Sequence, residues 1–219
     1  MFNDGDIKIE LLHDSQIQQS DNFINFKIII IGDSGVGKSS LIKRAVQNIF
    51  DSNYQPTIGF EFLLMHFNVN DEKIKLQIWD TCGQEMYRSL VQGFYRNTAF
   101  ALLVYDISRK NTFKNLDIWL QDIRKHTNED LPIFIAGNKN DLERKVSFDE
   151  AKVYAKSNRS INIMECSAKT GENSKEIFFE IAKFLYQTHK NVKENKSLSN
   201  RLIIESDNKN YFNKKKKCC

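Results

Sequence analysis

Short apolar runs alternate along this chain with stretches in which apolar residues recur every three or four positions. Such alternation is typical of an α/β fold, in which buried strands are joined by amphipathic helices. We expect strands over residues 26–31, 58–69, 73–79, 99–107, 131–136 and 161–166. We expect helices over residues 39–47, 111–126, 147–156 and 174–187. The pattern therefore predicts a mostly parallel six-stranded sheet with helices on both faces.

Spacing and end signals support two of these helices. In residues 111–126, one helical face collects the apolar positions Phe113, Leu116, Trp119, Leu120 and Ile123. Before the next helix, Ser147 is a candidate N-cap, and Glu150 completes a capping box. The expected strands 58–69 and 73–79 are joined at Asn70-Asp71, which is a turn signal.

The chain divides into three parts by composition. Residues 1–24 are polar apart from a Leu11-Leu12 pair, and we assign them to an N-terminal extension. Residues 25–190 carry the alternating pattern and are assigned to the folded domain. Residues 191–219 are rich in Asn, Lys and Ser, which predicts a disordered tail.

Composition limits the class of protein. The chain has 219 residues, of which 41% are hydrophobic and 27% charged, so it can build a packed core. Nine glycines and two prolines exclude a collagen-like chain, and four cysteines exclude a disulfide-stapled scaffold. The longest apolar runs, Ile28–Ile31 and Phe100–Val104, are far shorter than the roughly 20 residues of a membrane span. The N-terminus shows no secretory signal, and Phe2 stands where N-myristoylation needs glycine, so we expect a soluble intracellular chain.

Basic charge is concentrated at the C-terminal end. The formal net charge is +4, but residues 196–219 carry seven basic and two acidic side chains, so the rest of the chain is close to neutral. A nucleic-acid-binding domain would carry its basic residues on the folded surface, so we expect no nucleic-acid partner. A basic tail points instead to an anionic membrane surface.

The first expected strand is followed by a glycine-rich motif. Residues 32–39 read Gly32-Asp33-Ser34-Gly35-Val36-Gly37-Lys38-Ser39 and match G-x-x-x-x-G-K-[ST]. In such a loop the backbone N–H groups converge on phosphates, Lys38 reaches the β- and γ-phosphates, and the Ser39 hydroxyl reaches Mg²⁺. A glycine-rich turn matches by chance in about one chain of this length in a hundred, and the strand–loop–helix context makes it rarer. We therefore expect a phosphate-binding loop.

Four further segments indicate which nucleotide binds. They are Pro56-Thr57-Ile58-Gly59, Asp80-Thr81-Cys82-Gly83-Gln84, Asn138-Lys139-Asn140-Asp141 and Ser167-Ala168-Lys169. Each alone is compatible with an ordinary polar loop, but together with the phosphate loop they make five segments in a fixed order beside strand ends, where α/β sheets bind ligands. A carboxylate at Asp141 can accept hydrogen bonds from both N1–H and the exocyclic amine of guanine, a donor pair that adenine lacks. The sequence therefore predicts a guanine-nucleotide site and argues against the alternative of a P-loop ATPase or kinase.

These motifs and several longer runs resemble the Ras-like small GTPases, and within them the Rab branch. The resemblance covers residues 25–190 and the last two cysteines. The Rab-like runs are Ile58-Gly59-Phe60-Glu61-Phe62, Lys75-Leu76-Gln77-Ile78-Trp79, Arg88-Ser89-Leu90, Phe94-Tyr95-Arg96 and Leu103-Val104-Tyr105-Asp106-Ile107-Ser108. The resemblance implies a P-loop NTPase G domain that cycles between GDP and GTP.

The resemblance also implies how the nucleotide is held. The phosphates would be wrapped by Ser34, Gly35, Val36, Gly37, Lys38, Ser39 and Ser40. Phe50 would cover the guanine base edge-on. The base would be held by Asn138, Lys139, Asp141, Ser167, Ala168 and Lys169. The cofactor Mg²⁺ would be held by Ser39, Thr57 and, through a water, Asp80.

Two switch segments, residues 50–60 and 82–95, follow from the same resemblance. Thr57 and Gly83 would sense the γ-phosphate, and Gln84 would orient the attacking water. Positioning and electrostatics supply such catalysis, so unaided hydrolysis would run at about 10⁻⁴ to 10⁻³ s⁻¹ if it behaves like Ras, and an activating protein would accelerate it. An aromatic triad offered to effectors would comprise Phe62, Trp79 and Phe94, with plain packing between sheet and switch as the alternative.

Cys82 departs from the family, which almost always has Ala at this position. Cysteine is only slightly larger and tolerates burial, so we expect binding and hydrolysis to survive. The alternative is a hydrolysis-impaired GTP-binding scaffold.

The chain ends Lys214-Lys215-Lys216-Lys217-Cys218-Cys219, which resembles the Rab signal for double geranylgeranylation of Cys218 and Cys219. Two lipids anchor a protein stably where one is marginal. The resemblance then implies a monomer on the cytosolic face of endomembranes and in the cytoplasm. Its expected partners are an exchange factor, an activating protein, a GDP-dissociation inhibitor, a prenylation escort factor and effectors. A soluble GTPase with no membrane role is the alternative.

Overall fold

The computed structural model describes residues 7–52, 60–70, 72–82 and 92–194. The chain divides into two compact units, Met1–Ala182 and Lys183–Cys219. The sheet and the site described below lie within the first unit. A helix over residues 176–194 contributes its first residues to that unit and its last to the second.

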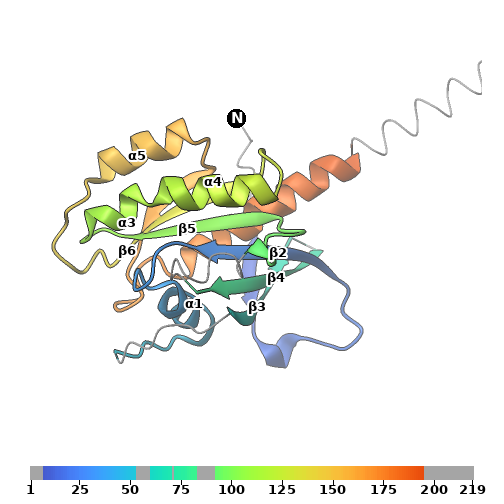
Figure 1. Ribbon diagram of the computed structural model, residues 1–219. Coiled ribbons are helices and arrows are strands. Elements are labelled where there is room, and N and C mark those ends of the chain that lie inside the picture. The colour runs from blue at the N-terminus through green and yellow to red at the C-terminus, as the bar shows by residue number, and fades with distance from the viewer. Residues whose placement is uncertain (1–6, 53–59, 71, 83–91, 195–219) are drawn as a thin grey trace, which may run out of the picture. The chain divides into compact units, whose positions relative to one another are not determined.

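The first unit is built on one seven-stranded sheet (Figure 1). The strands are β1 (Ile9–Leu12), β2 (Phe23–Ile31), β3 (Phe60–Val69), β4 (Glu72–Thr81), β5 (Phe100–Asp106), β6 (Ile133–Asn138) and β7 (Asn162–Glu165). They lie in the order β1-β3-β4-β2-β5-β6-β7. β3 is antiparallel to both β1 and β4, whereas the other neighbours are parallel. The expected α/β class with a mostly parallel sheet is confirmed.

The helices lie on both faces of this sheet. Besides the helix over residues 176–194, they are α1 (Lys38–Gln47), α3 (Lys110–Lys114), α4 (Leu116–His126) and α5 (Phe148–Ser157). A short 3-10 helix, η1 (Asp14–Gln16), lies between β1 and β2 in the sequence. Figure 1 shows α3, α4 and α5 on one side of the central strands and α1 on the other. Ser147 caps α5 as expected, since its Oγ accepts a hydrogen bond from the Glu150 N–H at 3.1 Å.

The expectation of six strands is wrong by one, because β1 forms within residues 1–24. Ile9 pairs with Val69 and Leu12 with His66, so the strand extends the sheet beyond β3. Lys8 and Asn70 fasten its start, with the Lys8 N–H donating to Asn70 Oδ1 at 3.1 Å and the Asn70 N–H donating to the Lys8 carbonyl at 2.8 Å. A four-residue strand at a sheet edge buries too little apolar surface to leave a clear pattern in the sequence.

The single helix expected over residues 111–126 is instead two helices that meet at Asn115. This residue ends α3 and precedes α4, with φ −71° and ψ −9°. Its side chain does not cap α4 but reaches Asp33, in a loop far away in the sequence. A tertiary hydrogen bond therefore accompanies the break, and helical periodicity alone cannot reveal it.

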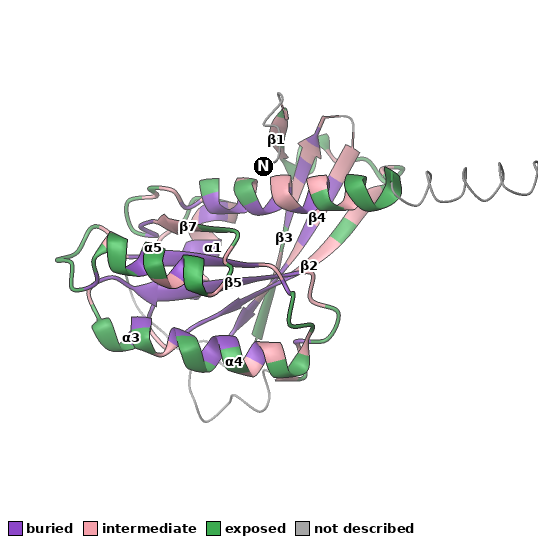
Figure 2. Ribbon diagram, turned by 90° about the horizontal axis from the view of Figure 1, so that it is seen from above, coloured by how far each residue is buried: buried purple, intermediate pink, exposed green. Residues whose placement is uncertain are grey.

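The core has two parts, one on each face of the sheet, because successive side chains along the central strands point to opposite faces. Ile29, Ile31 and Leu103 are fully buried in a cluster with the apolar face of α4, which includes Trp119 and Ile123. The residues between them, such as Ile28 and Ile30, are also fully buried and point to the opposite face. Figure 2 accordingly colours most of the central strands as buried. Burial on both faces explains why these strands are continuous apolar runs in the sequence.

Within the described part of the chain, no helix has both the length and the apolar character needed to cross a membrane.

Two buried tyrosines provide a matched test of this core. Both are fully buried, but the Tyr95 hydroxyl donates to Asp122 Oδ2 at 2.9 Å, whereas the Tyr105 hydroxyl has no hydrogen-bond partner among the described residues. Tyr105→Phe should raise the free energy of unfolding by about 1 kcal/mol, because it removes an unpaired buried polar group. Tyr95→Phe should lower it by about 2 kcal/mol, because it leaves a carboxylate oxygen without its donor.

Urea denaturation of the two variants and the wild type measures both changes. Equal destabilisation by the two substitutions would contradict the assignment of an unpaired hydroxyl at Tyr105.

Candidate functional site

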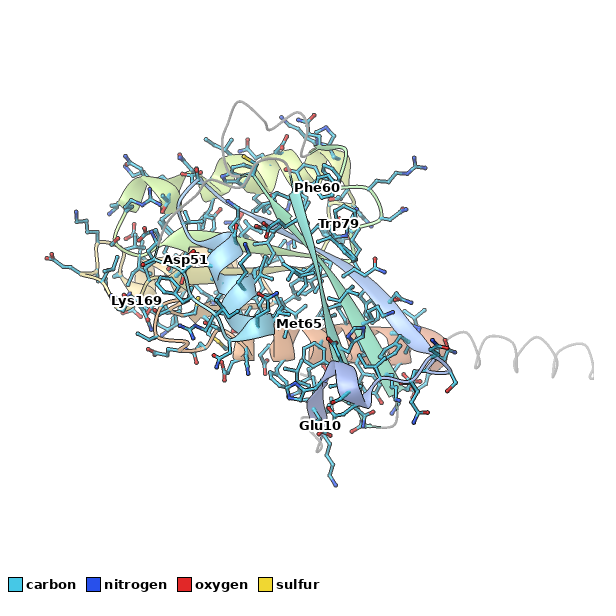
Figure 3. The ribbon with its side chains drawn as sticks, turned by 90° about the horizontal axis from the view of Figure 1, so that it is seen from below. Glu10, Asp51, Phe60, Met65, Trp79 and Lys169 are labelled. Atoms are coloured by element: carbon cyan, nitrogen blue, oxygen red, sulfur yellow. The ribbon has the colours of Figure 1, made fainter. Side chains whose placement is uncertain are left out.

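A cavity of about 820 Å³ opens where the strands β2, β5, β6 and β7 end. The expected site residues that line it are Ser34, Gly35, Gly37, Lys38, Ser39, Ser40, Phe50, Asn138, Lys139, Asp141, Ala168 and Lys169. Figure 3 labels Asp51 and Lys169, which both belong to its lining. Segments far apart in the sequence thus converge on one cavity at the carboxyl edge of the sheet, where ligands bind in open α/β folds.

The phosphate-binding loop runs from β2 into the start of α1. Gly37 is the residue before the helix and has φ +95°, a backbone conformation that glycine adopts readily. A Cβ at this position would lie 2.4 Å from the Asn138 Nδ2, so the close approach of the two loops also requires glycine. Lys38 and Ser39 at the start of α1 line the same cavity. The N-terminal end of a helix carries a partial positive charge, so this end of the cavity favours an anion.

Lys38 is the cation of this loop. Its side chain is almost fully buried, and its Nζ donates to the carbonyls of Gly32 at 2.7 Å and Asp33 at 3.0 Å. Burial lowers the pKa of Lys38 to about 8, against an opposing effect of Asp80. A phosphate beside Lys38 would stabilise its charged form.

Ser39 and Asp80 form the part of the site that fits a magnesium ion. The Ser39 hydroxyl donates to Asp80 Oδ2 at 2.5 Å, and Asp80 Oδ1 is buried with no hydrogen-bond partner among the described residues. Burial raises the pKa of Asp80 to about 6, although the Ser39 hydrogen bond opposes the shift. Mg²⁺ prefers oxygen ligands and is usually held by one or two carboxylates together with substrate phosphates and waters. The described residues contain no group of three or more His, Cys, Asp or Glu that could hold a metal.

The base-binding segments are joined to the phosphate loop and to one another. Asn138 Nδ2 donates to the Val36 carbonyl at 2.8 Å, and its Oδ1 accepts from the Ala168 N–H at 3.1 Å. The Lys139 Nζ donates to the Gly35 carbonyl at 2.7 Å. Val36 is buried and is not among the residues that line the cavity, so its expected contact with the phosphates stays a prediction.

Asp141 is held from the last of these segments. The Ser167 hydroxyl, which is fully buried outside the cavity, donates to Asp141 Oδ1 at 2.6 Å. The Lys169 Nζ lies 3.8 Å from Asp141 Oδ2. Both carboxylate oxygens therefore have a partner on the loop 167–169.

Sequence reasoning missed Asp106, a buried carboxylate at the end of β5 that lines the cavity. Its Oδ2 lies 2.8 Å from Lys139 Nζ and 2.9 Å from Arg109 Nε, and its Oδ1 accepts from the Ser108 hydroxyl at 2.6 Å. Burial would raise the pKa of Asp106, but the hydrogen bonds from Lys139 and Ser108 outweigh it and hold that pKa below its ordinary value. An acidic residue directly after an apolar strand was the available signal.

Asp33 was also missed as a functional side chain. It lies in the phosphate loop and is mostly buried, with Oδ2 accepting from Asn115 Nδ2 and Oδ1 from Trp119 Nε1, each at 2.8 Å. These two hydrogen bonds tie the phosphate loop to α4.

The three aromatic residues expected to meet effectors do come together. The Trp79 ring centroid lies 5.3 Å from that of Phe62 and 5.4 Å from that of Phe94. Phe60 joins them, 4.3 Å from Phe94, and Figure 3 shows it close to Trp79. Phe60 and Phe62 are each 46% exposed, so this cluster forms part of the surface in addition to packing between strands.

Several expected site residues lie outside the described residues. They are Thr57, Gly83, Gln84, Cys218 and Cys219. Cys82 is described: it is buried, carries a free thiol and lines the cavity.

The model of the Ras family matches residues 27–187, which is well over half of the chain.

The two hydrogen bonds of Asp33 hold the phosphate loop in place, so we expect their loss to speed the release of nucleotide. Asp33→Asn leaves one acceptor oxygen for two donors, so the loop should be held less firmly. We expect release of a fluorescent guanine nucleotide to become about tenfold faster, the effect of losing one charged hydrogen bond. Stopped-flow displacement by excess unlabelled nucleotide measures the rate.

Asp149→Asn is the matched control, because this side chain on α5 is 93% exposed and its ion pair with Lys152 is long, at 3.6 Å. Equal release rates for the two variants would contradict a role for Asp33.

Proposed function

The chain belongs to the Ras family of small GTPases, and on that premise we propose that it is a Rab-like GDP/GTP switch. It would hydrolyse GTP to GDP and phosphate and recruit effectors to membranes in vesicle traffic. The observation that carries the proposal is the convergence of the phosphate loop, Asn138 and Asp141 on one cavity.

Membership of the family supplies the general part of this function. Ras-like proteins bind GTP and GDP, typically with Mg²⁺, and switch between two states in response to exchange factors and activating proteins. Effectors bind the GTP-bound state.

The chain's own residues account for binding and orientation. Lys38 and the N–H groups at the start of α1 would hold the β- and γ-phosphates. Ser39 and Asp80 would hold Mg²⁺, which when bound neutralises charge that develops on the phosphates. Asp141, fixed by Ser167, would accept both guanine donors. Phosphoryl transfer to water needs no covalent intermediate, so positioning carries the catalysis.

Gln84 and Thr57 complete the proposal for hydrolysis. Gln84 would orient the attacking water, and Thr57 with Gly83 would order the switch segments around the γ-phosphate. Cys82 lines the cavity and directly precedes Gly83 in the sequence. This position, where the family almost always has Ala, makes a hydrolysis-impaired GTP-binding scaffold the second candidate.

The Rab assignment draws its support from the surface and from the tail. The partly exposed cluster of Phe60, Phe62, Trp79 and Phe94 offers an apolar surface for effectors. The basic run before Cys218 and Cys219 suits an anionic leaflet, at about 1 kcal/mol for each lysine near the surface. We place the protein in the cytoplasm and on the cytosolic face of endomembranes, escorted by a GDP-dissociation inhibitor and a prenylation escort factor.

The nucleotide that copurifies with the protein separates the two candidate functions. Protein purified without added nucleotide should release mostly GDP on denaturation, as identified by chromatography, because bound GTP will have been hydrolysed. Gln84→Leu should bind nucleotide normally but hydrolyse GTP at least about tenfold more slowly, since the amide that orients water is lost. Gln121→Leu, at an exposed position of α4, is the control.

Mostly GTP in the wild type would favour the scaffold. In that case Cys82→Ala should restore hydrolysis. ATP or ADP in the denatured sample would contradict guanine recognition altogether.

The lipid anchor is tested by removing its attachment sites stepwise. Cys219→Ser should weaken membrane association, and the double variant Cys218→Ser/Cys219→Ser should abolish it, because one lipid anchors only marginally. Fractionation of cells that express the full chain measures the membrane-bound share. Unchanged partitioning of the double variant would favour a soluble GTPase.

A further inference from the structure

Arg44, on the last turn of α1, takes no part in the proposed chemistry but contacts two segments assigned to the base. We infer that Arg44 is a positioning residue for guanine recognition: its guanidinium holds the loop 167–169 and, through that loop, the Asp141 carboxylate. The inference rests on the proposed function, because it concerns how the same site selects its base.

The guanidinium binds the backbone of the loop at two neighbouring residues. Its Nε donates to the Ala168 carbonyl at 2.8 Å, and its Nη2 donates to the Lys169 carbonyl at 2.7 Å. The planar, rigid fork of arginine suits two adjacent acceptors, which a single ammonium group does not match. Gly171, which follows the loop, has φ +92°, a backbone conformation that glycine adopts readily.

The loop in turn fixes Asp141. Ser167 donates to Asp141 Oδ1, and Lys169 approaches Asp141 Oδ2, so both partners of the carboxylate lie on the segment that Arg44 holds. The N–H of Ala168 also donates to Asn138 Oδ1. A shift of this loop would therefore turn the carboxylate that must meet two guanine donors at once.

The remaining nitrogen of Arg44 holds the other end of the base site. Its Nη1 donates to the Asn48 carbonyl at 3.1 Å and to Asn48 Oδ1 at 3.3 Å, where α1 ends. Phe50 follows two residues later, with its ring centroid 5.9 Å from Arg44 Cζ. One guanidinium thus supports both the loop behind Asp141 and the segment that carries the aromatic cover of the base.

The test compares two nucleotides that differ in one guanine donor. Inosine diphosphate lacks the exocyclic amine, so the ratio of its Kd to that of GDP reports the alignment of Asp141. Arg44→Met should reduce this ratio by about tenfold, because one hydrogen bond to the base is misaligned. Arg44→Lys keeps the charge without the fork and should reduce the ratio to a smaller extent, about threefold. Competition against a fluorescent GDP, with the full-length protein, gives both constants.

Arg124→Met is the matched control, since Arg124 on α4 also donates to a backbone carbonyl, that of Asn158 at 2.9 Å, away from the cavity. The control should leave the ratio unchanged. Equal weakening of both nucleotides by Arg44→Met, with the ratio preserved, would overturn the inference and leave Arg44 a merely structural residue. If the methionine variant fails to fold, the ratio measured for the lysine variant distinguishes the same two outcomes. A wild type that does not prefer GDP would instead contradict the proposed function.

Discussion

The site depends on the side-chain amide of Asn138, which is almost fully buried and joins two loops. Its nitrogen donates to the carbonyl of Val36 in the phosphate loop, and its oxygen accepts from the N–H of Ala168 in the loop 167–169. The two loops approach so closely that Gly37 has no room for a Cβ beside this amide. Phosphate and base recognition are therefore fixed to one another by a single polar group, which neither an apolar nor a charged residue can replace, because it must donate and accept at once.

The buried charged groups in and next to the cavity lining differ in how far the protein itself compensates their charge. Asp106 is satisfied within the protein by Lys139 and Arg109, so it stays charged and holds Lys139 against the phosphate loop. Lys38 and Asp80 are less completely compensated, and burial disfavours the charged form of each. Phosphate beside Lys38 and a divalent cation beside Asp80 would each stabilise that charged form, which links tight binding to the burial of these two groups.

The sequence predicted the elements that leave a periodic or motif signal, and it failed where a partner lies far along the chain. The central strands are visible because both of their faces are buried. The strand β1 was missed because its four residues at a sheet edge carry no such signature. The break at Asn115, the anchor at Asp33 and the fork of Arg44 each depend on a partner between 82 and 125 residues away. No local pattern encodes these contacts, so only the fold reveals them.

One face of α4 makes hydrogen bonds to two segments that lie far apart in the sequence. Trp119 holds Asp33 of the phosphate loop, and Asp122, less than one turn further on, accepts from Gln92 Nε2 at 3.1 Å and from the Tyr95 hydroxyl at 2.9 Å. Residues three apart lie on the same side of a helix, so both anchors share one rigid element. The phosphate loop and the residues that end the second switch segment are thus hydrogen-bonded to the same helix. A displacement of either one relative to the other must break a hydrogen bond to a buried or partly buried carboxylate, and this cost restricts the site to a small number of arrangements.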